Sequence, residues 1–368
     1  MLISSAVLFW NLEKQMVDES VNFPASNKAA LQDSKGKSAP AGITDTKEEV
    51  NQESDYILDC SGDFPNNISE SDLKKYSDPD YFDDAFKGNK ELSSQIAYAL
   101  STNSVIGKID EGQIDQVDPV VLLGQLVNEQ PYKSLVHYFL VSKCNEQSDS
   151  PRCDDSVISE AISNDPNNGA LWFQIAAKEA RKNNLEGLIL ALEQLISAPN
   201  YNEYWAETIE IFDRALQSNG LVKDGPRMIM AIGYAAAVSL GPIQELFKAC
   251  REHSTNRADI AQLCIDAGQK VSTHAKTILN QALGYSLQEQ VFKAINDSEN
   301  EVKMRKLKIS IYRVPKASIR INKLLIFDEE LGRYWFTQLK LFGERKFFQL
   351  AYDEAVRLSS NPDYNPCN

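Results

Sequence analysis

The chain has 368 residues, 43% of them hydrophobic, which is enough for two compact domains or for one extended array of helix pairs. Its net charge is −14 and its pI is near 4.8. Because nucleic-acid binding requires clustered Lys and Arg, this acidity argues against that class of protein, and no nucleic-acid partner is expected. The acidity is typical of a soluble surface.

Residues 1–10 form a short apolar segment, with a continuous run from Leu2 to Trp10. About ten residues are too few to span a bilayer, which takes roughly 20. The segment also lacks the basic start and the small-residue cleavage site of a secretory signal. It is either a hydrophobic segment packed on the core or the remnant of a signal anchor that begins upstream of Met1. We favour the anchor, and hence a membrane tether, because a polar segment follows.

Residues 11–90 have the composition of a polar, acidic and largely flexible linker. Between Asp45 and Asp84 the chain carries thirteen acidic residues against three lysines, which is typical of a solvated surface or an unfolded arm. Aromatic residues within it predict that parts of the linker fold against the body. These are Tyr56, Phe64, Tyr76, Tyr81, Phe82 and Phe86.

Residues 91–300 are predicted to form the helical body. Asp118 followed by Pro119 is a strong helix start, because Asp caps the first turn and Pro fits its first position. A nearly uncharged helix over 228–240 is expected to be central, since it is apolar almost all round. The other predicted helices cover residues 93–100, 118–127, 132–141, 155–162, 172–181, 185–196, 202–217, 242–250, 258–268 and 273–285. The sequence therefore predicts an all-α fold, an irregular stack of antiparallel helix pairs.

Residues 155–200 resemble the tetratricopeptide repeat, a helix pair of about 34 residues. Ala161 and Pro166 have the spacing of a small residue and the terminal proline of that repeat. The bulky, aliphatic and small positions of the next first helix are matched by Trp172, Ile175 and Ala176. The chain is also similar to helical-repeat proteins of bacterial cell envelopes with no assigned activity. The resemblance implies stacked helix pairs whose concave face binds a partner protein or peptide.

The match is degenerate. Glu179 stands where the repeat has an aromatic residue, and Leu188 and Leu195 stand where it has small residues. The closing proline, Pro199, comes one position early, although Trp205 follows Trp172 by 33 residues. We expect the tryptophans to belong to the core rather than to a ligand site, as aromatic residues at helical spacing usually do.

Six cysteines, none of them in a Cys-x-x-Cys pair, argue against a zinc site. Free cysteines could simply be buried in a reducing compartment, but their spacing favours three disulfides. These are Cys144–Cys153, Cys250–Cys264 and Cys60–Cys367. The first would close a loop of eight residues, the second would link successive helices, and the third joins the two that remain. Other pairings stay open. Disulfides place the protein in the periplasm or another extracytoplasmic compartment, the alternative being the cytoplasm.

Residues 301–368 are predicted to hold a basic segment and a closing helical hairpin. Between Lys303 and Lys323 there are eight basic residues and no acid. Polar and apolar residues alternate over 306–312 and Pro315 interrupts any helix, so an irregular or hairpin segment is expected near 303–327. We favour a solvated segment that pairs with the acidic N-terminal region. The alternative is an anion-binding site formed by Lys306, Lys308, Arg313, Lys316 and Arg320.

After the basic segment, residues 328–358 are predicted to form two helices whose aromatic residues close the end of the stack. The polar residues 344–346 are expected to mark a turn or an exposed face near Gly343.

The chain contains none of the common nucleophile, nucleotide or metalloprotease motifs. His137 is expected to be a core residue, and His253 and His274 could assist a thiol only if the nearby cysteines were free. No catalytic residue, cofactor or metal site is predicted. We expect a non-catalytic interaction or scaffold module of a cell envelope that binds a partner protein or peptide. The alternative is an enzyme or effector whose site is assembled from scattered residues, with an anionic ligand at 303–323.

Overall fold

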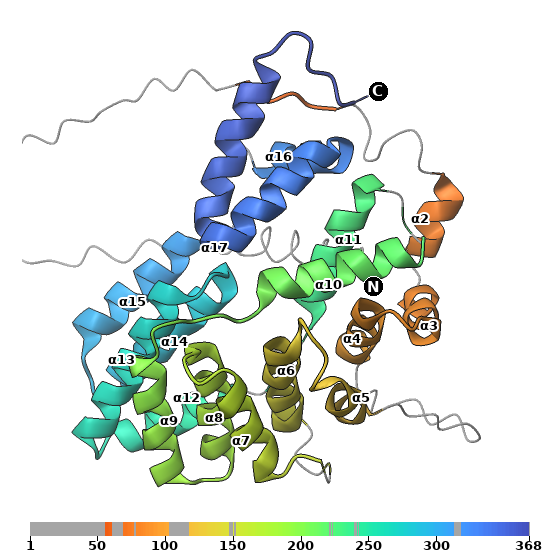
Figure 1. Cartoon of the computed structure of the whole chain (residues 1–368). Coiled ribbons are helices and arrows are strands. Elements are labelled where there is room, and N and C mark those ends of the chain that lie inside the picture. Colours follow the sequence, from red (N-terminus) through yellow and green to blue (C-terminus); the bar gives the residue numbers. More distant parts are fainter. Residues whose placement is uncertain are drawn as a thin grey trace, which may run out of the picture.

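A computed structural model shows that the protein is all-α, with adjacent helices packed as antiparallel pairs in a stack (Figure 1). It describes residues 56–60, 69–76, 79–102, 118–146, 150, 152–220, 222, 224–238, 241, 243–312 and 318–367. The apolar segment 1–10 and most of the predicted linker lie outside these residues.

The helices follow one another closely, and most connections are short. The first half of the chain forms α2 (Glu70–Tyr76), α3 (Pro79–Gly88), α4 (Leu92–Ser101), α5 (Pro119–Leu126), α6 (Lys133–Glu146), α7 (Asp155–Asn164), α8 (Gly169–Arg181), α9 (Leu185–Ser197) and α10 (Trp205–Ser218). The second half forms α11 (Asp224–Ala237), α12 (Gln244–Ser254), α13 (Ala258–His274), α14 (Ile278–Ala294), α15 (Ser298–Ile311), α16 (Ser318–Phe327) and α17 (Glu329–Ser359).

Side-chain caps explain why several helices begin where they do. The Asp118 carboxylate accepts the Val120 N–H at 2.8 Å, so the predicted Asp-Pro start is confirmed. Asn168 caps α8 through the N–H of Ala170, and Asp328 caps α17 through the N–H groups of Glu330 and Leu331. Each cap satisfies donors that a helix N-terminus otherwise leaves without partners.

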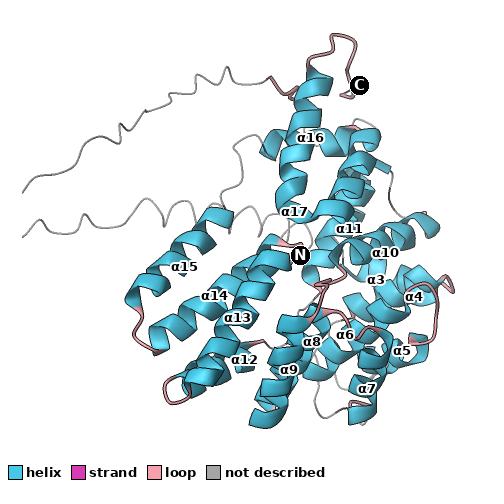
Figure 2. Cartoon of the chain, turned by 60° about the vertical axis from the view of Figure 1, so that its left-hand side comes forward, coloured by secondary structure: helices cyan, strands magenta, loops and turns pink. Residues whose placement is uncertain are grey.

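The stack consists of hairpins that pack side by side. α8 and α9 form one hairpin, and they pack on α12 and α13, respectively. α13, α14 and α15 then continue as a row of successive antiparallel helices (Figures 1 and 2). On the other side, α6 packs on α8 and pairs with α5 and α7. This arrangement gives each amphipathic helix two neighbours against which to bury its apolar stripe.

The pair α10–α11 leaves this row. It packs against α4 and against the C-terminal helices α16 and α17, whereas α9 is followed in the stack by α13 (Figure 1). Trp205 begins α10, so the 33-residue spacing of the tryptophans does not mark the next unit of the row. We call α10 and α11, with the helices that pack on them, the branch. Within it Phe212 and Tyr234 stack, with ring centroids 5.1 Å apart, and Phe82 and Phe86 from α3 pack around them.

Two short parts of the predicted linker belong to this folded body. Phe82 and Phe86 are fully buried, as the aromatic pattern suggested. Ile57 and Cys60 are also buried, and the Leu58 N–H donates to the Ser359 hydroxyl at 2.9 Å. The chain before α2 is therefore attached to the end of α17.

Several predicted elements differ from the structure. The helix expected to be central, α11, buries Ala231, Tyr234 and Ala235 and leaves much of its remaining surface half-exposed. α13 runs past Gly268, where an end was predicted. The glycine does not end the helix there but allows the backbone of α14 to approach closely. A Cβ on Gly284 would lie 2.6 Å from the Gly268 carbonyl oxygen, so both glycines allow the two helices to touch.

The basic segment is also helical where strand-like alternation was predicted. Residues 303–311 belong to α15, which Asp297 caps through the N–H of Asn300. Met304 and Ile311, spaced seven residues apart, are buried on the side that packs against α14, and Lys308 lies between them. Packing at helical spacing outweighs the two-residue alternation of 306–312, which was a weak signal over so short a run.

The closing hairpin is confirmed. Its two helices are both labelled α17, and they meet at Gly343, whose φ is +76°. Trp335 and Phe347 are buried in edge contact, with centroids 4.3 Å apart, but Phe342 is 53% exposed. At the junction of the two helices, the Glu344 N–H donates to the Lys276 carbonyl at 2.8 Å, which docks α17 on the start of α14.

We expect Gly343→Ala to destabilise the protein by about 2 kcal/mol, because a Cβ adds strain at positive φ and collides with its neighbour. That Cβ would lie 2.6 Å from the Lys276 carbonyl oxygen. Urea unfolding followed by circular dichroism measures the loss. Gly88→Ala is the matched control, since a Cβ there meets nothing within 4 Å. Equal effects of the two substitutions would contradict the docking role of Gly343.

Candidate functional site

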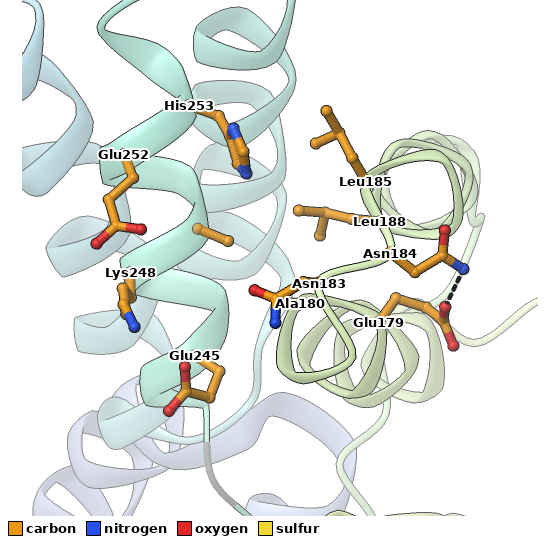
Figure 3. A pocket seen from close by; sticks show the side chains of 11 residues that line it. Glu179, Ala180, Asn183, Asn184, Leu185, Leu188, Glu245, Lys248, Glu252 and His253 are labelled. Carbon is orange, nitrogen blue, oxygen red and sulfur yellow. Dashed lines mark hydrogen bonds between the residues drawn. The ribbon is translucent and has the colours of Figure 1, made fainter.

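A shallow groove lies between the α8–α9 turn and α12 (Figure 3). Leu185 and Leu188 project from α9 toward α12, where Ala249 and His253 form the opposite side. Asn183, in the turn between α8 and α9, has a positive φ of 53° that turns the chain sharply between the two helices. The groove is thus formed where two hairpins of the stack meet.

Both walls of the groove are held firmly. The Asn184 side chain caps α9 through the Gly187 N–H and also donates to the Glu179 carboxylate at 2.6 Å. On the other wall, the disulfide between Cys250 and Cys264 ties α12 to α13. The groove is therefore part of the rigid stack.

The rim of the groove is acidic. Glu179, Glu245 and Glu252 contribute three carboxylates, against one ammonium group from Lys248. Within the described chain, Glu245 and Glu252 form no ion pair. Glu179 is paired with Lys182, whose Nζ lies 3.9 Å from a Glu179 carboxylate oxygen. A small apolar contact beside the unpaired carboxylates of Glu245 and Glu252 suits an apolar side chain flanked by basic residues. No signal in the sequence pointed to this groove, since its residues come from helices about 60 positions apart.

The six cysteines form the three pairs that their spacing favoured. Cys144–Cys153 closes the loop between α6 and α7, Cys250–Cys264 joins α12 to α13, and Cys60–Cys367 joins the N-terminal region to the tail after α17. All six cysteines are bridged, which indicates an oxidising, extracytoplasmic location. A thiol nucleophile assisted by His253 or His274 is excluded, because both neighbouring cysteines are disulfide-bonded.

Three of the five candidate anion-binding residues are described, and they lie on two helices, α15 and α16. Lys306 is exposed on α15 and Arg320 is exposed on α16, a helix of the C-terminal branch. Lys308 donates to the Glu289 carboxylate at 2.6 Å. Arg313 and Lys316 lie outside the described residues. Lys323 pairs with Asp59 at 3.1 Å, a contact of the kind expected between this segment and the acidic N-terminal region.

Two carboxylates, those of the buried Glu203 and the half-buried Glu344, converge on the N-terminus of α14. One oxygen of Glu203 accepts the N–H groups of Lys276 and Thr277, at 2.9 and 2.7 Å, and the Glu344 carboxylate accepts that of Ile278. Burial raises the pKa of Glu203, and burial together with the nearby Glu203 raises the pKa of Glu344 to about 7. These carboxylates cap a helix, and Glu344, at the turn that its polar run predicted, points toward the start of α14.

Two other buried groups could in principle carry chemistry. His137 is 2% exposed and its Nε2 lies 3.1 Å from the Asn164 amide, so it is the core residue that the sequence predicted, and burial lowers its pKa. Lys178 is also buried, and burial lowers the pKa of its ammonium group. Its Nζ has no hydrogen-bond partner in the described part of the chain. It does not line the groove.

Among the described residues, no group of three or more His, Cys, Asp or Glu side chains is placed so that it could bind a metal ion. None of the described helices combines the length and apolar character that a membrane span requires. Comparison with known proteins found no matching family model, curated protein or solved structure.

Proposed function

We propose that this protein is a non-catalytic interaction module of a cell envelope, a tetratricopeptide-like helical stack tethered near its N-terminus. The groove between the α8–α9 turn and α12 binds a peptide segment of a partner protein. The observation that carries the proposal is the acidic rim of that groove above its leucine floor. The three disulfides support an extracytoplasmic setting, which in a bacterium is the periplasm.

The groove favours a basic partner. Leu188 is 1% exposed and supports Leu185, which is half-buried and offers a small apolar contact for one side chain. The carboxylates of Glu245 and Glu252 lie on the same helix, seven residues apart, and no cation of the described chain pairs with either. A peptide with an apolar residue between two lysines or arginines would satisfy both features.

We expect a fluorescein-labelled nonapeptide with one leucine flanked by lysines to bind the full-length protein, as measured by fluorescence anisotropy. Glu245→Gln combined with Glu252→Gln should weaken its affinity by about tenfold, because two rim carboxylates are lost. The same peptide with glutamates in place of the lysines should not bind.

The matched control is Glu193→Gln, which removes an exposed carboxylate from α9 outside the groove. The affinity of this variant for the peptide should stay within about twofold of that of the unmodified protein at equal salt. Binding that is lost equally in the control, or that persists in the groove variant, would show that general negative charge and not the groove attracts the peptide.

A further inference from the structure

The outer face of α15 is a second surface of unusual composition, separate from the groove. We define it by Val302, Lys303, Lys306 and Ile309. All four side chains are exposed, and the two β-branched residues are 43% and 47% exposed. A single exposed aliphatic residue is ordinary, but two that share one side of a helix, two turns apart, form a small patch.

The spacing places the centre of this patch directly away from the stack. Val302, Lys306 and Ile309 lie at positions i, i+4 and i+7, so they share one side of the helix. Met304 and Ile311 occupy the opposite side and are buried where α15 packs along α14. The helix therefore has two apolar sides, of which one is covered.

The uncovered side is basic in an otherwise acidic protein. Arg305 and Lys308 are neutralised by Glu289, and Arg305 also by Glu301, all within the stack. Lys303 and Lys306 form no ion pair within the described chain. Two unneutralised ammonium groups beside aliphatic side chains select a partner that is both apolar and acidic.

The position of α15 in the fold indicates what kind of element would cover it. Two views show α15 as the outermost helix of the row α13, α14 and α15 (Figures 1 and 2). The last helix of a stack normally presents a polar outer surface, because it has no further neighbour. Here the outer surface also presents Val302 and Ile309 two turns apart, which matches the contact line of one more antiparallel helix.

We propose that the outer face of α15 docks an acidic amphipathic helix of a second protein, which extends the stack by one helix. The narrow stripe of Val302 and Ile309 fits the seam of a helix pair. A helix that lies on a lipid surface instead carries a broad apolar face with large hydrophobic residues, and α15 has no aromatic residue on its outer side. This interaction is separate from peptide binding in the groove.

The test is site-specific photo-crosslinking with the full-length protein in its native host. A photoreactive phenylalanine analogue replaces Val302 or, in a second strain, Ile309, and the adducts are mapped by mass spectrometry. The expected product at both positions is a segment of another protein with apolar residues at helical spacing and acidic flanks. The control position is Leu190 on α9, which is 55% exposed on another surface and should not give that adduct.

A second set of variants tests the contribution of charge to this crosslinking. Lys303→Glu combined with Lys306→Glu should lower the yield of the Val302 adduct by about tenfold, because like charges then face the partner. Lys87→Glu combined with Lys90→Glu makes the same charge change at the same spacing on an exposed part of the branch, and should leave the yield unchanged. Adducts with lipid or with this chain itself, a partner without the acidic pattern, or no adduct above the Leu190 control would each overturn the proposal.

Discussion

Glu344→Gln is expected to stabilise the protein at pH 8 by up to about 3 kcal/mol, because it removes a charge that the fold desolvates. The pKa of this carboxyl rises from 4.5 to about 7 on folding. The folded state thus holds the proton more tightly, and the corresponding stability is fully present below pH 4.5 and lost as the pH rises through 7. The amide oxygen of the substituted side chain can still accept the Ile278 N–H that the carboxylate accepts.

The measurement is urea unfolding of both proteins at pH 5 and at pH 8. The difference between variant and unmodified protein should be small at pH 5 and large at pH 8. The groups around this site are Glu203 on the turn before α10, Tyr138 on α6, Tyr201 and Tyr312, and burial raises the pKa values of all four. Glu193→Gln, at an exposed position of α9, is the control. A stability difference that is equal at both pH values would contradict a titrating Glu344.

Replacement of Cys60 and Cys367 by serine is expected to have the largest effect of the three disulfide removals, roughly 6 kcal/mol in the chain-entropy model. The two cysteines are 307 residues apart, so this bond closes a loop around most of the folded body. It also holds Ile57, which is 1% exposed, in the core beside the end of α17. Its loss should free that segment.

Two readouts test this expectation. Urea unfolding should rank the Cys60–Cys367 variant below the Cys144–Cys153 variant, whose cysteines are 9 residues apart and whose removal costs less than about 3 kcal/mol. Limited proteolysis should cut near residue 60 in the first variant only. Equal destabilisation by both variants would show that loop length does not determine the contribution of these disulfides.

The sequence predicted a structural feature correctly where all the residues that produce it lie in one short segment. Asp118 with Pro119 predicted the start of α5, because a cap and its helix are adjacent in the chain. The turn at Gly343 was equally visible, since a positive φ suits glycine. The cysteine spacing favoured all three disulfides, but only the folded chain shows that Cys60 and Cys367 meet.

The sequence by itself determined the all-α class and the positions of most helices, and its cysteine spacing favoured an oxidising compartment without fixing the pairs. Periodicity and caps act within a few residues, so they can be read along the chain. Only the tertiary structure decided that α10–α11 leaves the row and that the groove forms between α9 and α12. It also turned Glu344 inward onto the start of α14 and left one side of α15 uncovered. These features depend on contacts between segments that are distant in the chain. Burial at such contacts shifts the pKa of groups that look ordinary in the sequence, as it does for Glu344.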